Sequence, residues 1–423
     1  MIYNFFRILS NIAIRVYYGK IEVSGIENIP KGVPLLIASN HPNGFLEPII
    51  IGCIFPRPLH FMVRGDVFRM KWLKPFLVRT NQIPIFRFKD GFSELRKNDS
   101  SLQVAYKELD KGAAIILFIE GGTLNIKKLR PFQKGLARMA SSYVDREGGR
   151  KDLHVLPVAI NFVSPFVLRS RVFLNIEKPF KAEDYFHDSS QKTAEIRKMT
   201  DDLYSLIKPI AFHVSDDERQ EALNKTLKFT EGLFSSPFLP IVSYKPKLWN
   251  YFKSVSDSID EMDDTKFINF NKEINEIGEV RIDDVKRSIK WPIINGVLSF
   301  LLLVPAFIGL ILNIIPGLIA QTLAKKVLDE DNSVFKASII LSSGIGFYAV
   351  YYIVIIGTLS IFYGIKSLLF LLAWPLGFVY LLWKSIFQSL FLKRKYQLTK
   401  PQKDGIINLF SKYNITLPKT SNL

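Results

Sequence analysis

The chain has 423 residues, which is long for one average domain and predicts two domains, or one domain and a membrane region. Hydrophobic residues make up 48% of it, more than a soluble enzyme usually carries and less than a protein lying wholly within a membrane. The net charge of +17 is typical of proteins that bind nucleic acid or an anionic membrane surface. With no zinc-ligand spacing, no basic helix with heptads and no RRM-type aromatic block, the sequence favours the membrane surface over nucleic acid.

The N-terminal residues 1–19 are predicted to form an amphipathic helix in a membrane interface, because Arg7 and Arg15 alternate with apolar residues. They lack the early basic region and the Ala-x-Ala site of a signal peptide. A helix packed on the protein is the alternative. The single cysteine, Cys53, excludes an intramolecular disulfide and agrees with a reducing, cytoplasm-facing catalytic part. Its apolar surroundings predict a buried structural thiol rather than a nucleophile.

Strand-like and helical patterns alternate over residues 20–215. The predicted strands are 20–25, 33–38, 60–63, 113–119, 155–162 and 172–177, and the predicted helices are 46–54, 100–111 and 133–144. This alternation indicates an α/β layer fold. The polar and charged residues 216–290 predict a helical extension.

Long apolar runs follow the extension. Residues 293–323 contain no charged residue and are long enough to span a bilayer, and residues 335–392 contain no acid and are long enough for two more spans. We therefore predict an all-α transmembrane region at 291–395 and a cytoplasmic tail at 396–423. Basic clusters before and after the region favour both ends in the cytoplasm and hence an even number of crossings. Three apolar blocks do not match an even number, so one re-entrant segment or hairpin remains open.

Four blocks within the α/β region carry candidate chemistry. In the first, NHPNGFLEP at 40–48, His41 ends a predicted strand and Glu47 follows six positions later. A turn of this length can fold the carboxylate back onto the imidazole, where it would hold the tautomer and stabilise the imidazolium of a general base.

The other three blocks are weaker when each is taken alone. Arg87 ends the apolar strand QIPIFR at 82–87 and could present a guanidinium to a phosphate. In FIEGGT at 118–123, glycines after a strand free backbone N–H groups to face an anion. The block VLPVA at 155–159 reads by itself as a core strand.

Together these blocks resemble the glycerophospholipid acyltransferase family, the PlsC-like glycerol-3-phosphate and 1-acylglycerol-3-phosphate acyltransferases. That family carries a His-x4-Asp or His-x5-Asp block, a strand ending in Arg, a Phe-Pro-Glu-Gly-Thr-Arg block and a strand with Pro-Val, in this order. The segments FMVR at 61–64 and PFQKGLAR at 131–138 are also similar to family segments. The resemblance covers about residues 20–215.

The resemblance implies an acyltransferase α/β domain with a mixed sheet flanked by helices. It implies His41 as the base and Glu47 as its orienting carboxylate. The substrate-binding residues it implies are Asn40, Arg64, Arg87, Glu120, Gly121, Gly122 and Thr123, with Arg64 and Arg87 on the acceptor phosphate. The expected reaction moves a fatty acyl group from acyl-CoA or acyl-carrier protein, as co-substrate, to a hydroxyl of glycerol-3-phosphate or 1-acylglycerol-3-phosphate in phospholipid synthesis. No cofactor and no metal is expected, since the remaining histidines lack metal-ligand spacing. The expected setting is an integral membrane protein with its catalytic domain facing the cytoplasm.

Two departures from the family pattern leave alternatives open. Glu47 stands where the family has Asp, at the longer spacing, so the loop must retreat slightly to keep the contact. In the third block the family Arg is replaced by Thr123 or Leu124, and Lys127, Lys128 or Arg130 are candidates for the missing charge. The alternatives are an acyltransferase for another lysolipid, such as a lyso-aminolipid, and a non-catalytic lipid-binding membrane protein.

Overall fold

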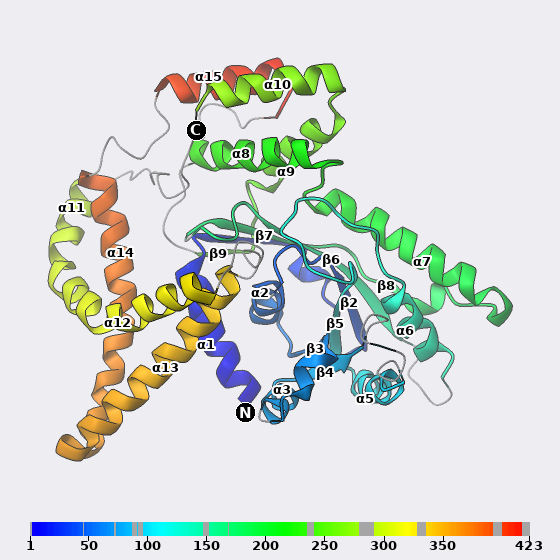
Figure 1. The fold of residues 1–423 in the computed structure, drawn as a ribbon, viewed down its shortest axis with the longest axis horizontal. Coiled ribbons are helices and arrows are strands. Elements are labelled where there is room, and N and C mark those ends of the chain that lie inside the picture. Colours follow the sequence, from blue (N-terminus) through cyan, green and yellow to red (C-terminus); the bar gives the residue numbers. More distant parts are fainter. Residues whose placement is uncertain are drawn as a thin grey trace.

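Figure 1 shows the computed structural model of the chain, which describes residues 2–44, 46–71, 73–86, 91, 96–146, 152–167, 169–234, 241–278, 292–327, 336–391 and 400–416. A nine-stranded sheet forms its centre. The strands are β1 Lys20–Ser24, β2 Leu35–Ser39, β3 Leu59–Arg64, β4 Gln82–Ile85, β5 Ala114–Phe118, β6 His154–Phe162, β7 Arg171–Ile176, β8 Phe180–Lys181 and β9 Val242–Ser243.

The sheet order is β4-β3-β5-β2-β6-β7-β1-β9, with β8 on β6. The five strands from β4 to β6 are mutually parallel, β6 and β7 are antiparallel, and β7, β1 and β9 are parallel again. The expected mixed sheet flanked by helices is therefore confirmed. The parallel half matters most for function, because all of its strands end at the same edge.

Helices cover both faces of the sheet (Figure 1). They are α1 Ile2–Tyr17, α2 Leu46–Ile54, α3 Lys74–Arg79, α5 Asn98–Asp110, α6 Gly135–Val144 and α7 Lys192–Ile207. Alternate residues of β2 show how the two faces are filled, since successive strand side chains point to opposite sides. Leu35 and Ile37 pack in the core with α1 and α2, whereas Leu36 and Ala38 pack in the core with α5, α6 and α7. A strand buried on both faces must be apolar throughout, as β2 is.

The sequence of the N-terminal helix α1 left two roles open, a helix in a membrane interface and a helix packed on the protein, and the two halves of α1 differ in burial. Its last turns carry Ile14 and Tyr17 into the core beneath the sheet. Phe5 and Ile8 nearer its start are exposed. An interfacial role for that exposed half stays a prediction, as do the domain boundaries.

A separate helical layer, α8 Asp217–Leu233, α9 Trp249–Glu261, α10 Asp264–Glu276 and α15 Lys400–Lys412, builds its own core against β7. Buried ion pairs tie it to the sheet. Arg171 of β7 is fully buried between Glu22 of β1 and Glu231 of α8, with its Nε 3.1 Å from Glu231 Oε2. The other oxygen of Glu22 accepts the backbone N–H groups of Lys247 and Leu248 at 3.0 and 3.2 Å. Since an unpartnered buried charge is strongly destabilising, this network joins the layer to the sheet.

The apolar part of the chain forms α11 Pro292–Leu301, α12 Leu303–Val327, α13 Lys336–Tyr363, the 3-10 helix η9 Gly364–Leu372 and α14 Ala373–Phe391. Within the described residues, one stretch, Gly346–Leu371, is helical, long and apolar enough to cross a membrane, and only 6% of its most apolar window is buried. The core helix of a soluble protein would be mostly buried, so this stretch is not packed as a core helix. The predicted all-α transmembrane region as a whole stays a prediction.

Candidate active site

The first and third sequence blocks meet at the carboxyl ends of β2 and β5. These strands are parallel neighbours with Ser39 opposite Phe118, so the residues that follow them emerge side by side. The ring of Phe118 stacks on the imidazole of His41, with centroids 4.1 Å apart and planes 15° apart. Phe118, the first residue of the third block, is thus a site residue to which the sequence analysis assigned no role, and its position at the end of the predicted strand was the available signal.

The His41 imidazole faces the carboxylate of Glu47. The loop between them turns at Gly44, which has φ +81°, and α2 then begins at Leu46. Glu47 is fully buried, and its Oε1 lies 3.7 Å from His41 Nδ1 and accepts the backbone N–H of Asn43. A separation of 3.7 Å is too long for a hydrogen bond but short enough for strong charge interaction in a buried setting.

The hydrogen-bonding capacity of the two side chains also favours pairing between His41 and Glu47. Among the described residues, neither His41 Nδ1 nor Glu47 Oε2 has a hydrogen-bond partner, although both atoms are buried. A small closing movement would satisfy His41 Nδ1 with the carboxylate. Orienting Nδ1 toward Glu47 leaves Nε2 as the nitrogen available to a substrate hydroxyl.

Asn40 holds the start of the loop. Its Nδ2 donates to the carbonyl of Ile160 at 3.1 Å, and the N–H of Ile160 donates to its Oδ1 at 2.9 Å. This pair of hydrogen bonds to β6 fixes the backbone immediately before His41. A contact between Asn40 and substrate stays a prediction.

The third block forms a loop folded around Arg130. Arg130 Nε donates to Glu120 Oε2 at 2.9 Å, and Arg130 Nη2 donates to the carbonyl of Gly122. The backbone N–H and the imidazole of His41 lie close enough to the Glu120 carboxyl to lower its pKa, which couples this loop to the base. Burial raises the pKa of the Glu120 carboxyl, and the Arg130 guanidinium opposes that rise. Among the three candidates for the missing charge, the structure thus brings Arg130 to the block.

The geometry of the loop requires a glycine at its second position. Gly121 has φ +70°, and a Cβ there would lie 2.6 Å from Cγ of Gln133. Thr123 follows, half-buried. Lys127 points elsewhere, because its ammonium bonds Asn224 of α8 and the carbonyl of Val163. Burial lowers the pKa of Lys127 to about 7.

Of the two predicted phosphate arginines, the structure describes Arg64, which lies toward the far side of the parallel strands. Arg64 ends β3 opposite Ile85 of β4, and β5 separates β3 from β2 and His41. Its exposed guanidinium is paired with Asp66, with Nε 3.2 Å from Oδ1. Arg87 lies outside the described residues. Asn98 fixes the residue before it, since its side-chain amide bonds both the N–H and the carbonyl of Phe86 at 2.8 Å.

Among the described residues, the other histidines form no comparable pair with a carboxylate at this edge. His60, at the opposite end of β3, lies 3.6 Å from Glu108 of α5 through Nε2 and Oε2. His213 accepts the backbone N–H of Leu129 at 3.0 Å through Nδ1. In the part of the chain that the structure describes, no group of three His, Cys, Asp or Glu side chains could hold a metal ion. Operation without metal or cofactor stays a prediction.

Comparison with known proteins gives this domain its class. The family model described as Acyltransferase matches residues 20–161. A curated relative, 1-acyl-sn-glycerol-3-phosphate acyltransferase of Bacillus subtilis (strain 168), is 29% identical over 104 residues, which are 24% of this chain and 48% of that protein. The chain therefore spans about half the length of this relative. The crystal structure of the 1-acyl-sn-glycerophosphate (LPA) acyltransferase PlsC from Thermotoga maritima has 18% sequence identity and a TM-score of 0.34, covering 47% of this chain and 78% of that chain.

Residues 20–161, within the α/β region, thus match an acyltransferase domain. Residues 20–161 belong to the PlsC-like glycerophospholipid acyltransferase family, as the sequence blocks predicted.

Proposed function

We propose that the protein is an O-acyltransferase that moves a fatty acyl group from acyl-CoA or acyl-carrier protein to a hydroxyl of glycerol-3-phosphate or 1-acylglycerol-3-phosphate in phospholipid synthesis. The observation that carries the proposal is the buried Glu47 carboxylate 3.7 Å from His41 Nδ1. This pair lies at the sheet edge where the Glu120 loop begins, after β5. Family membership of residues 20–161 supports the reaction type.

In the proposed reaction His41 Nε2 removes the proton from the acceptor hydroxyl as its oxygen attacks the thioester carbonyl. The Glu47 carboxylate stabilises the imidazolium that forms. The carbonyl oxygen becomes an oxyanion beside the Glu120–Gly122 loop, whose backbone N–H groups are the candidate donors. Collapse breaks the C–S bond, the thiolate takes the proton from His41, and the acyl ester and the free thiol leave. No acyl-enzyme is required.

Arg130 is proposed to keep the third block in shape for this chemistry. It neutralises Glu120 and ties that carboxylate to the carbonyl of Gly122, so the loop is fixed before substrate arrives. Arg64 and Arg87 are proposed to hold the acceptor phosphate.

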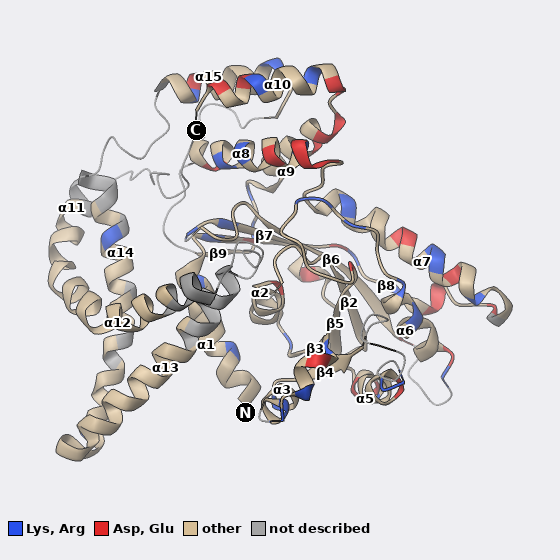
Figure 2. Ribbon diagram, in the orientation of Figure 1, with Lys and Arg blue, Asp and Glu red and all other residues tan. Residues whose placement is uncertain are grey.

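We also propose that the protein is attached to a membrane, with the catalytic domain on the cytoplasmic side. Figure 2 shows charges of both signs on α7 to α10, whereas the described parts of α12 and α13 carry almost none. Large apolar side chains are exposed along these helices, for example Phe307, Ile353 and Phe362. A surface of this kind is stable against lipid rather than water.

The test compares membranes containing wild-type protein, His41→Ala or His60→Ala, each given an acyl-CoA and labelled glycerol-3-phosphate or 1-acylglycerol-3-phosphate. The expected result is labelled product from the wild type and His60→Ala, and none from His41→Ala. His60 is the matched control because it too lies beside a glutamate, at the other end of the sheet. Equal product from all three would refute His41 as the base.

A second acceptor class is favoured by one observation. The Arg64 guanidinium is paired with Asp66, so it is less available to bind a phosphate. A lysolipid without a terminal phosphate, such as a lyso-aminolipid, is the corresponding acceptor. An acceptor panel distinguishes the two, since a preference for phosphate-free acceptors would overturn the first assignment. Absence of product with every acceptor and with both donors would favour a lipid-binding protein without catalysis.

A further inference from the structure

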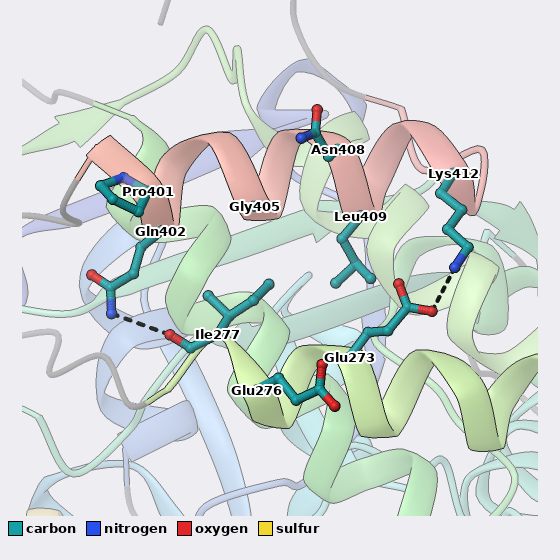
Figure 3. A pocket seen from close by; sticks show the side chains of 9 residues that line it. All are labelled: Glu273, Glu276, Ile277, Pro401, Gln402, Gly405, Asn408, Leu409 and Lys412. Atoms are coloured by element: carbon teal, nitrogen blue, oxygen red, sulfur yellow. Dashed lines mark hydrogen bonds and ion pairs between the residues drawn. The ribbon is translucent and has the colours of Figure 1, made fainter.

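The chain leaves the helical layer after α10 and returns to it with α15. Leu409 and Phe410 of α15 lie in the same core as Phe270 and Ile274 of α10. Figure 3 shows the groove between the two helices, with its polar contacts. Lys412 Nζ lies 2.6 Å from Glu273 Oε1, and Gln402 Nε2 donates to the carbonyl of Ile277 at 3.3 Å. The two ends of the apolar segment α11–α14 therefore lie on the same side of any membrane that this segment enters.

The segment α11–α14 therefore crosses the membrane an even number of times. The break between α11 and α12 shows how three apolar blocks can give an even number. The block is divided at Leu302 into α11, of 10 residues, and α12. At 1.5 Å per residue α11 is about 15 Å long, about half of the roughly 30 Å hydrocarbon core. The chain then turns back, and α12 runs at a wide angle to α11 with its far end near α1 (Figure 1).

The turn between α11 and α12 is wholly apolar. Phe300 is 77% exposed and Val304 66% exposed, and no polar side chain lies between them. A turn that emerged on the far side of a membrane would place these side chains in water, whereas a turn inside the bilayer leaves them in hydrocarbon.

The second pair of helices reaches further. α13 has 28 residues and is about 42 Å long, more than the hydrocarbon thickness. Its first end lies near α1, and its other end projects away from the sheet (Figure 1). The turn into η9 carries Lys366, the one charged residue of the sequence between 337 and 383, next to Ile365, which is 83% exposed. A lysine at this position can reach the opposite headgroups.

A polar cluster fixes the two hairpins to each other. Asn313 of α12 donates through Nδ2 to the carbonyls of Gly309 and Ala373, and its Oδ1 accepts the hydroxyl of Tyr352 at 2.9 Å. The helices touch at backbone level, because a Cβ on Gly309 would lie 2.0 Å from the carbonyl oxygen of Leu376. Satisfied polar groups and small residues at helix crossings are how helices associate in lipid.

The charges in the sequence agree with this path. Basic residues flank all four outer helix ends, and Lys366 stands alone at the two turns. The flanking residues are Lys286, Arg287, Lys290, Lys325, Lys326, Lys336, Lys393, Arg394 and Lys395. Under the positive-inside rule, these ends lie on the cytoplasmic side, where an anionic leaflet also attracts them.

We propose that α11–α12 is a re-entrant hairpin that ends inside the bilayer at residues 301–303, and that α13–η9–α14 is a hairpin that crosses it twice and exposes Lys366 on the far side. The partner of this surface is a lipid bilayer entered from the side of the catalytic domain. The proposal extends the membrane attachment above and does not depend on the acyl-transfer chemistry.

The test uses full-length Cys53→Ala protein, which has no other cysteine, with one reporter at a time: Gln103→Cys on the exposed side of α5, Leu301→Cys or Ile365→Cys. A membrane-impermeant maleimide is added to sealed right-side-out and to inverted vesicles. We expect Gln103→Cys to react only in inverted vesicles and Ile365→Cys only in right-side-out vesicles. Leu301→Cys should react in neither until SDS is added.

Other outcomes overturn specific parts of the proposal. Reaction of Leu301→Cys in right-side-out vesicles means that α11–α12 crosses the bilayer. Protection of Ile365→Cys in both preparations means that the second hairpin is also re-entrant. Release of the protein by alkaline carbonate, measured on each variant and on Cys53→Ala alone, means that no hairpin is inserted. Acyl-transfer activity enters none of these readouts, so failure here leaves the proposed reaction standing.

Discussion

Replacing Glu47 by Gln tests the central pair of the site. The amide keeps the size of the side chain and an oxygen that can accept the N–H of Asn43, but it removes the charge facing His41. For unit charges 3.7 Å apart, an effective dielectric constant of about 20 gives an interaction of about 4.5 kcal/mol, or roughly 10³ in rate. Because His41 is partly exposed, we expect kcat to fall by about 10²- to 10³-fold, with KM for the acceptor nearly unchanged.

The assay measures initial rates of labelled ester formation with purified protein in lipid-detergent micelles, over a range of acceptor concentrations. The matched control is Glu108→Gln, because Glu108 Oε2 lies 3.6 Å from His60 Nε2 in a pair of similar spacing at the other end of the sheet. It should keep kcat within about twofold of the wild type. A Glu47→Gln enzyme as fast as the control would refute the role of the buried carboxylate, and a loss confined to KM would show that it binds substrate instead.

Three further predictions follow from other contacts. Arg130→Leu should lower kcat/KM for the acceptor by about 10- to 100-fold and Arg130→Lys by less, because the guanidinium makes charge-assisted bonds to both Glu120 and Gly122; equal constants for all three proteins in steady-state kinetics would contradict this. Arg171→Met should lower the free energy of unfolding by about 3–5 kcal/mol in denaturant titrations, since it leaves two buried carboxylates unpaired; an unchanged midpoint would speak against the network. The native Cys53 thiol should react with a maleimide near neutral pH about 10³-fold more slowly than after denaturation in SDS, because burial raises its pKa to about 12 and shrinks the thiolate fraction; equal rates would mean that the thiol is accessible.

The sequence predicted the part of the fold that depends on local pattern. The apolar run 113–119 became β5 Ala114–Phe118, and the apolar block 46–54 became α2 with the same bounds. Parallel neighbouring strands end at one edge, so blocks placed after strands by pattern alone were brought together, as His41 and Glu120 show.

What the sequence could not give depends on contacts between distant segments. The two-residue strand β9, Val242–Ser243, pairs with β1 although its own pattern carries no strand signal. The role of Arg130 was one of three possibilities until the fold turned Lys127 toward α8. The break at Leu302 falls within a continuous apolar run, where composition gives no boundary. In each case tertiary packing decided among options of similar local propensity.

The return of α15 to α10 has a consequence for how the protein is made. Its core residues Ile406, Leu409 and Phe410 complete a cluster begun by α8 to α10, yet they leave the ribosome after all of the apolar helices. In the proposed topology, the helical layer therefore stays unfinished until the apolar helices have entered the membrane. Joining two segments so far apart in a free chain carries a loop-closure penalty, and hairpins that bring the chain back to the same membrane surface reduce it. In that topology, correct insertion becomes a condition for completing the helical layer, and a chain inserted wrongly would leave the core of this layer without α15.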